Sequence, residues 1–293
     1  MPSEERRPAV SVHGGQFHGP LHLGDGPQIN VHHTPRRPLT TTVVVVAVLA
    51  VTAGLFWFGR QLYTSSPGYR MAAEERLLTE LVPGRGYYRI QQALGTEPDH
   101  SVALPSGNRL HQYEREWETV QVVEGASGTA LSVGVYTKDP EFRPALVLGG
   151  RDLRLNATTV AEAVSPFLPA AALGYCGAHK GGYLEGYYPM PNAYGTRNVV
   201  VGVSNAQSAA IDTSRVCAAL AAAPCAIPES KYDNVLSAAY AGCLLRSRDF
   251  RTAREGITVT ALVHTAPGAA VVPDMLHPPD VVAGGALSSG TAG

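Results

Sequence analysis

The residues best suited to chemistry lie in one glycine-rich stretch, where Cys176 and His179 are three positions apart. This spacing is typical of half a zinc site or of a thiol beside its base. No other cysteine has a histidine within four residues, and the chain contains no G-x-S-x-G, P-loop, H-E-x-x-H or G-x-G-x-x-G motif. We therefore assign no catalytic, cofactor-binding or metal-binding residue. The enzymatic alternative is a cell-envelope enzyme or assembly accessory factor with a pocket near Cys176, His179 and Glu185.

The four cysteines indicate disulfides, because an even number of them is typical of proteins that fold in an oxidising compartment. Cys217 and Cys225 are the best pair, since the turn at Pro224 could fold Cys225 back. Cys176 and Cys243 would then form the second bridge. Four cysteines allow three pairings, and the sequence does not choose among them. The alternative is four buried thiols in a cytosolic domain.

An uncharged apolar run from Leu39 to Phe58 has the length that a helix needs to cross a bilayer. We expect a transmembrane helix over 39–59 and a lipid bilayer as partner. A cleaved signal peptide is the weaker alternative, because 38 residues precede the run. Arginines on the two sides do not decide the orientation. The cysteines, all C-terminal to the run, favour a cytoplasmic N-terminus and an extracytoplasmic C-terminal domain in a single-pass protein.

Changes in composition divide the remaining chain into tails, a stalk and one globular region. The expected fold class is an α+β soluble domain, built of helices plus antiparallel hairpins and possibly duplicated, on a single transmembrane helix. The expected segments are a flexible N-tail over 1–38, a stalk over 60–70, the α+β domain over 71–265 and a disordered tail over 266–293.

Apolar periodicity and turn residues predict the elements of this domain. The predicted helices cover 72–81, 87–94, 158–164, 208–222 and 231–246. The predicted strands cover 113–120, 129–137, 182–188, 196–204 and 257–263. In the first strand aromatic and other side chains alternate with Glu114, Glu116 and Glu118, which we interpret as its solvated side.

The second predicted hairpin carries the motif Tyr183-x-Glu185-x-Tyr187-Tyr188, followed by Tyr194. It resembles the aromatic signature of an uncharacterised family of bacterial single-pass membrane proteins, although Met190 replaces an expected glycine. The resemblance implies no activity. The order helix, glycine, hairpin is also similar to small lipoproteins of the outer-membrane barrel-assembly machinery. The tyrosines are interpreted as cross-strand pairs or, alternatively, with Glu185 as a recognition groove.

The N-tail contains two short apolar segments, with Leu21 and Leu23 in one and Gln28, Ile29 and Val31 in the other. Joined by a glycine- and proline-rich turn, they have the pattern of a β-arch that stacks with other copies. The tail resembles the amyloid-type signalling segments of some bacterial proteins, from which Pro20 and Pro27 depart. The alternatives are a disordered tail or histidine-mediated metal binding.

A net charge of −1 and only three lysines predict no nucleic-acid partner. The sequence thus favours a membrane-anchored, non-enzymatic interaction, sensing or scaffolding protein with an unknown ligand. A protein partner, or a second copy bound through the N-tail, is the expected macromolecular contact.

Overall fold

The computed structural model describes residues 39–148, 151–176, 181–192, 195–205, 208–225 and 237–269. The chain forms two compact units, residues 1–58 and 59–293, which we describe separately. The described part of the first unit belongs to helix α1 (Leu39–Ser65). The N-tail with its predicted self-assembly residues, and most of the predicted C-terminal tail, lie outside the described residues.

The predicted transmembrane helix over 39–59 is wrong for the part of the chain that the structure describes, where no helix is long and apolar enough to cross a membrane. The apolar run of α1 ends at Phe58. Arg60 and Gln61 follow it in the same helix. The single-pass topology and the bilayer contact rested on this segment.

The predicted stalk over 60–70 contains the end of one helix and the start of the next. α1 ends at Ser65, and α2 (Pro67–Glu80) begins directly after Ser66, whose hydroxyl accepts a hydrogen bond from the Tyr69 amide at 3.4 Å. A proline at the first helical position starts α2, because its missing N–H would have no partner there. Helix α3 (Tyr87–Leu94) follows, as predicted, and ends at Gly95 with a φ of 71°.

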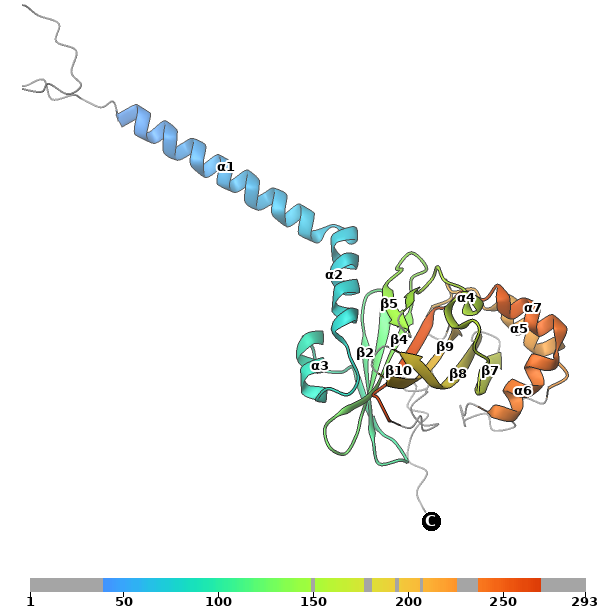
Figure 1. The fold of residues 1–293 in the computed structure, drawn as a ribbon. Coiled ribbons are helices and arrows are strands. Elements are labelled where there is room, and N and C mark those ends of the chain that lie inside the picture. The colour runs from blue at the N-terminus through green and yellow to red at the C-terminus, as the bar shows by residue number, and fades with distance from the viewer. Residues whose placement is uncertain are drawn as a thin grey trace, which may run out of the picture. The chain divides into compact units, whose positions relative to one another are not determined.

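The second unit is an α+β domain built on one large antiparallel sheet (Figure 1). Its strands are β1 (His100–Ala103), β2 (Arg109–Glu114), β3 (Glu118–Glu124), β4 (Ala130–Thr137), β7 (Ala171–Cys176), β8 (Gly181–Asn192), β9 (Gly195–Ser204) and β10 (Ala261–Thr265). A separate two-stranded ribbon consists of β5 (Ala145–Leu148) and β6 (Arg151–Arg154). The remaining helices are α4 (Val160–Val164), α5 (Ser214–Ala222), α6 (Ala238–Arg246) and α7 (Arg248–Glu255).

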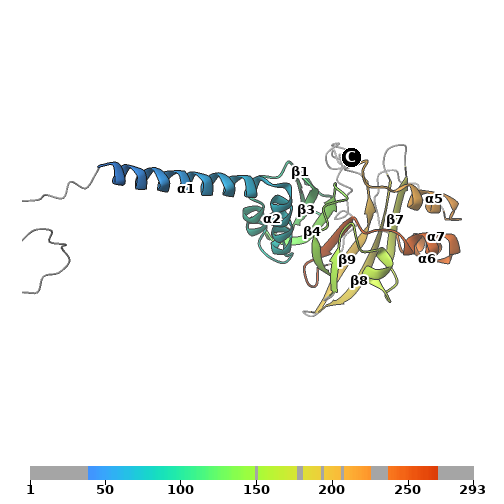
Figure 2. The same ribbon diagram turned by 90° about the horizontal axis from the view of Figure 1, so that it is seen from above.

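The sheet joins two meanders through the last strand. Its order is β1-β2-β3-β4-β10-β9-β8-β7, so β10 closes the gap between β4 and β9. The register pairs Val263 with Gly134 on one side and with Val200 on the other. Figure 2 shows α5, α6 and α7 gathered beside β7, at the end of the sheet opposite β1. Helix α6 is fastened there by two backbone hydrogen bonds between Ala172 and Ser237.

Helices α2 to α7 all contribute buried side chains to one face of the sheet. Their buried side chains, such as Ile90, Leu220 and Phe250, belong to one apolar cluster with the inward residues of the strands, such as Val122 and Val201. A second cluster on the opposite face contains strand and loop side chains only among the described residues. Every second side chain of a strand points toward the helices. These side chains, including polar ones, are therefore removed from water.

The predicted strand over 113–120 is two strands. Arg115 donates its backbone N–H to the Glu118 carbonyl at 2.9 Å, and this tight turn separates β2 from β3. The interpretation of the glutamates as a solvated side is wrong at Glu118, whose side chain is fully buried. The turn shifts the alternation, so that Glu118 faces the helices beside Val120.

Candidate ligand pocket and buried ion pair

The predicted recognition motif forms a buried ion-pair network on β8. Arg254 of α7 donates from Nε to Glu185 Oε2 and from Nη2 to Oε1, both at 2.7 Å. The Tyr183 hydroxyl donates to Oε2 at 2.7 Å, and the Tyr187 hydroxyl donates to Oε1. Arg254 Nη2 also donates to the Tyr187 oxygen at 2.9 Å. Each carboxylate oxygen of Glu185 thus accepts two hydrogen bonds, which is how a buried charge is made tolerable.

This network holds α7 on the sheet and leaves little of the motif for a partner. Tyr183, Glu185 and Tyr187 expose 1%, 0% and 2% of their surface. Burial, followed by the neighbouring Glu185 charge, raises the pKa values of both tyrosines, so they remain protonated donors. The Tyr188 side chain and Tyr194 lie outside the described residues. A recognition groove on these tyrosines stays a prediction, although the three described side chains are core residues.

The two disulfides predicted from the cysteine count are present, but the pairing is different. Cys176 at the end of β7 pairs with Cys217 of α5, and Cys225 pairs with Cys243 of α6. Cys217 lies in the second turn of α5 and faces β7, where its Sγ is 3.9 Å from the Tyr175 carbonyl oxygen. The Cys217 sulfur is therefore bonded to β7, and Cys225 is left to bridge to α6.

Cys176 and Glu185, two of the three residues of the predicted enzymatic pocket, lie apart on the sheet. Cys176 is oxidised, so it supplies no thiol for a nucleophile or a metal. It lies opposite Gly181, four positions along β8 from Glu185, or about 13 Å at ~3.3 Å per residue. His179 lies outside the described residues. Elsewhere in the described chain, no group of three or more histidine, cysteine or acidic side chains could hold a metal ion.

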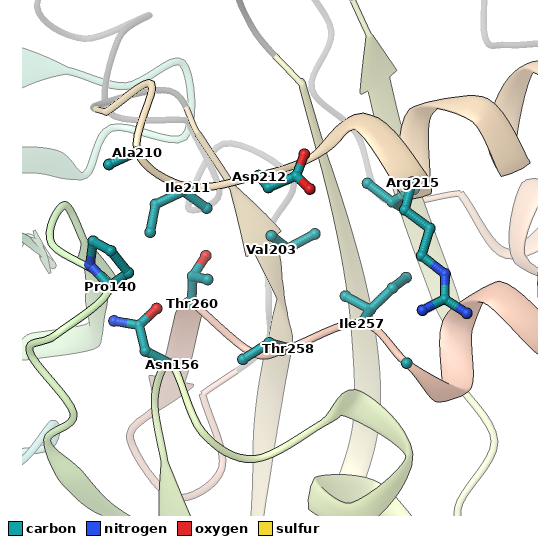
Figure 3. Close-up of a pocket in the computed structure, with 12 residues that line it drawn as sticks. Pro140, Asn156, Val203, Ala210, Ile211, Asp212, Arg215, Ile257, Thr258 and Thr260 are labelled. Atoms are coloured by element: carbon teal, nitrogen blue, oxygen red, sulfur yellow. The ribbon is translucent and has the colours of Figure 1, made fainter.

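A pocket of about 400 Å³ opens beside the helical layer, where β9, α5 and the segment before β10 meet (Figure 3). Buried apolar side chains form its floor: Val203, Ile211, Val216 and Ile257. Pro140 and Asn156 lie on one side, and Asp212 and Arg215 lie on the other (Figure 3). This size is at the lower end for small-molecule sites.

Hydrogen bonds fix the side of the pocket that contains Asn156 and Thr260. Asn156 adopts a φ of 58°, a left-handed conformation that asparagine tolerates better than most residues. Its Nδ2 donates to the carbonyls of Asp139 at 3.0 Å and Phe142 at 2.7 Å. The Thr260 hydroxyl accepts the Ser204 amide at 3.0 Å. These polar groups are already committed to the fold, so they shape the pocket more than they offer free contacts.

Asp212 and Arg215 lie on the rim of the pocket and do not form an ion pair with each other. Asp212 Oδ1 accepts the Ser214 amide at 2.9 Å. Hydrogen bonds from the Ser214 side chain, and then from its amide, lower the pKa of Asp212 and keep it a carboxylate. Arg215 lies flat over Gly256, where an added Cβ would be 2.8 Å from Nη1. Among the described residues, Arg215 forms no hydrogen bond or ion pair, not even with Asp212 three positions earlier. The rim therefore offers a guanidinium and a carboxylate to a ligand.

The described lining is suited to binding more than to catalysis. It contains no histidine, cysteine or serine, and its one carboxylate has a lowered pKa, which makes a weak general base. Sequence reasoning did not find this site. The run Asp212-Thr213-Ser214 signals a helix start, but nothing local places it beside Ile257 or Thr260.

Comparisons with protein-family models, with curated proteins and with solved structures give no match. The resemblances described for the hairpin motif and the N-tail stay predictions. The functional argument therefore rests on the geometry of this chain.

Proposed function

We propose that the second unit is a binding or sensing domain, and that the pocket beside α5 is its ligand site. The observation that carries the proposal is a pocket with a buried apolar floor and, on its rim, a guanidinium that has no partner among the described residues. Pockets that combine apolar surface with a few directed polar groups are the usual ligand sites of proteins. Arg215 favours a small ligand that has an acidic group at one end and an apolar body.

The surroundings support a preformed site. The Cys176–Cys217 bridge ties α5 to β7, and the Glu185–Arg254 pair ties α7 to β8. The pocket is lined by the first turn of α5 and by Gly256 directly after α7, so both attachments stiffen its walls. A preorganised pocket loses less conformational entropy when a ligand binds.

A blocking variant tests the site. Ala210 is exposed at the pocket margin, so Ala210→Trp places an indole in the opening without disturbing the core. Ala218→Trp is the matched control, because Ala218 is exposed on α5 and does not line the pocket. The chain would be screened by thermal shift against small carboxylates and phosphates that carry an apolar group. We expect a ligand that raises the Tm of the wild type and of Ala218→Trp but not of Ala210→Trp.

Two results would contradict this function. A ligand that stabilises both tryptophan variants equally would bind elsewhere. A panel that leaves the wild-type Tm unchanged at millimolar concentration would remove the site from consideration. Replacing Arg215 by glutamine should weaken a confirmed acidic ligand about tenfold, the loss expected for one charge-assisted hydrogen bond at a partly solvated rim.

We also propose that this domain functions in an oxidising compartment outside the cytoplasm. Two disulfides account for all four cysteines, and such bridges persist where thiols are not kept reduced. The experiment is cysteine labelling of intact cells with a membrane-impermeant reagent. Labelling only after reduction supports the proposal. Free thiols that are labelled without reduction after lysis would place the domain in a reducing compartment.

A further inference from the structure

A serine, a histidine and a glutamate form a hydrogen-bonded chain at the β1 edge of the sheet. Ser101 of β1, His111 of β2 and Glu124 of β3 lie on neighbouring strands. Ser101 Oγ is 2.8 Å from His111 Nδ1, and His111 Nε2 is 2.9 Å from Glu124 Oε2. A carboxylate only accepts, so Nε2 carries the imidazole proton and donates it to Glu124. Nδ1 is then an acceptor, and the Ser101 hydroxyl donates to it.

The imidazole is held in place on every side. The Tyr87 ring stacks on it with the ring centroids 4.1 Å apart and the planes 15° from parallel. The His111 side chain is 6% exposed, whereas Ser101 is exposed. Burial lowers the pKa of His111 against the opposing effect of Glu124, with a smaller lowering from Arg109. His111 is therefore neutral at pH 7, as a general base must be.

The backbone of the edge strand supplies a further donor. Leu104 donates its N–H to the Asn108 carbonyl at 2.9 Å, so the backbone N–H of Leu104 points toward β2. In an antiparallel pair the inward groups alternate along the strand. The backbone N–H of Val102 therefore also points toward β2, while the N–H of Ser101 points away from β2. Because β1 is the outer strand in the sheet order, this N–H faces outward beside the hydroxyl.

We propose that Ser101, His111 and Glu124 form a nucleophilic triad that hydrolyses carboxylic esters at the sheet edge. Ser101 Oγ bonds to the acyl carbon while its proton moves to His111 Nδ1, and Glu124 stabilises the resulting imidazolium. The outward N–H of Ser101 can donate to the developing oxyanion. The ester C–O bond then breaks, and the leaving alcohol takes the proton from His111. A water molecule repeats the sequence on the acyl-serine, which releases the acid and restores Ser101.

This activity is independent of the pocket beside α5, because β1 and β7 are the opposite edges of the sheet. The charged and titratable groups that face His111 are Glu124 from β3, Tyr87 from α3 and Arg109 from β2. Ester hydrolysis should therefore fall as the pH decreases through the pKa of His111, which lies below its ordinary value of 6.5.

The test uses the full chain with two probes. A fluorophosphonate reports an activated serine, with the modified residue located by peptide mass spectrometry, and p-nitrophenyl acetate reports turnover. Ser101→Ala removes the nucleophile. Ser127→Ala is the matched control, since Ser127 is exposed in the nearby β3–β4 turn and donates to Thr129 Oγ1. Glu124→Gln keeps the shape of the orienting side chain but removes its charge.

We expect the fluorophosphonate to label Ser101, and the label to persist in Ser127→Ala. Ser101→Ala should lose the turnover above background, and Glu124→Gln should lower it at least tenfold. Labelling of Ser101 no faster than of Ser127 would overturn the triad. A Ser101→Ala variant that hydrolyses the ester at the wild-type rate, with an unchanged circular dichroism spectrum, would do the same.

Discussion

Replacing Glu118 by glutamine should stabilise the protein at neutral and alkaline pH. The Glu118 side chain is fully buried at the start of β3, and neither of its oxygens has a hydrogen-bond partner among the described residues. Arg115 Nε lies 3.5 Å from Oε1, but Glu74 of α2 already holds this guanidinium, with Nη2 donating to Glu74 Oε2 at 2.9 Å. Burial, together with the adjacent Glu74 carboxyl, raises the pKa of Glu118 to about 9.

The sign of the pH effect follows from the difference between the pKa of Glu118 in the folded state and its pKa in the unfolded state. Between the ordinary value of 4.5 and about 9, the folded state keeps a proton that the unfolded state has lost. The free energy of unfolding therefore decreases as the pH rises, by about 1.4 kcal/mol per unit. By pH 7 the cumulative loss from this group is about 3 kcal/mol, an order-of-magnitude figure. Glutamine carries no titrating proton, so Glu118→Gln should avoid the loss.

Urea unfolding followed by circular dichroism at pH 5, 6, 7 and 8 measures the effect. The wild type and Glu118→Gln should have nearly equal free energies of unfolding at pH 5. The difference in favour of Glu118→Gln should grow with each pH unit. Glu185→Gln is the matched control, because Glu185 is equally buried but is neutralised by Arg254. That variant leaves the buried Arg254 guanidinium without its anion, so its free energy of unfolding should be lower by about 3–5 kcal/mol at pH 7.

The reasoning is refuted if the wild type and Glu118→Gln show parallel stability curves between pH 5 and pH 8. A loss of stability in Glu118→Gln as large as that in Glu185→Gln would also contradict it. Either result would mean that Glu118 is stabilised as an anion in the folded protein.

Three further changes test the two disulfides and a helix cap. Removing the Cys176–Cys217 bridge, which closes 41 residues, should lower the free energy of unfolding by about 4 kcal/mol, and removing the Cys225–Cys243 bridge, which closes 18, by about 3 kcal/mol. Non-reducing peptide mapping would contradict this pairing if it found Cys217 joined to Cys225. Thr159→Ala breaks the capping box of α4 and should cost about 1 kcal/mol, measured as a shift of the urea midpoint at constant m.

Local signals predicted the elements whose ends are set by nearby residues. Helix α3 covers the predicted 87–94, because Ile90 and Leu94 share one face and Gly95 provides the left-handed cap. The turn between β3 and β4 falls where the glycines predicted it, with Gly128 at a φ of 74°. In these segments the propensity, the apolar period and the turn residues agree, which is when sequence reasoning is reliable.

Other elements were missed because long-range contacts override their local pattern. Helix α7, Arg248–Glu255, is highly charged, yet Phe250 is fully buried and Arg254 enters the core to meet Glu185. The alanine-rich segment of β7 carries little strand propensity, but β8 pairs with it along its whole length. The pocket could not be predicted either, since its walls come from segments that are distant in sequence.

The two buried glutamates show why the candidate sites depend on tertiary structure. Both occupy inward positions on strands, and each has an arginine within reach. The partner of Glu185, Arg254, comes from 69 residues away and meets no competing anion among the described residues. Arg115, the local partner of Glu118, is bound by Glu74, which lies 41 residues before it. Glu185 is thus held in an ion pair, whereas Glu118 is a buried acid. At pH 7 Glu118→Gln should stabilise the protein and Glu185→Gln should destabilise it, and this opposite sign would trace the difference to the two arginines.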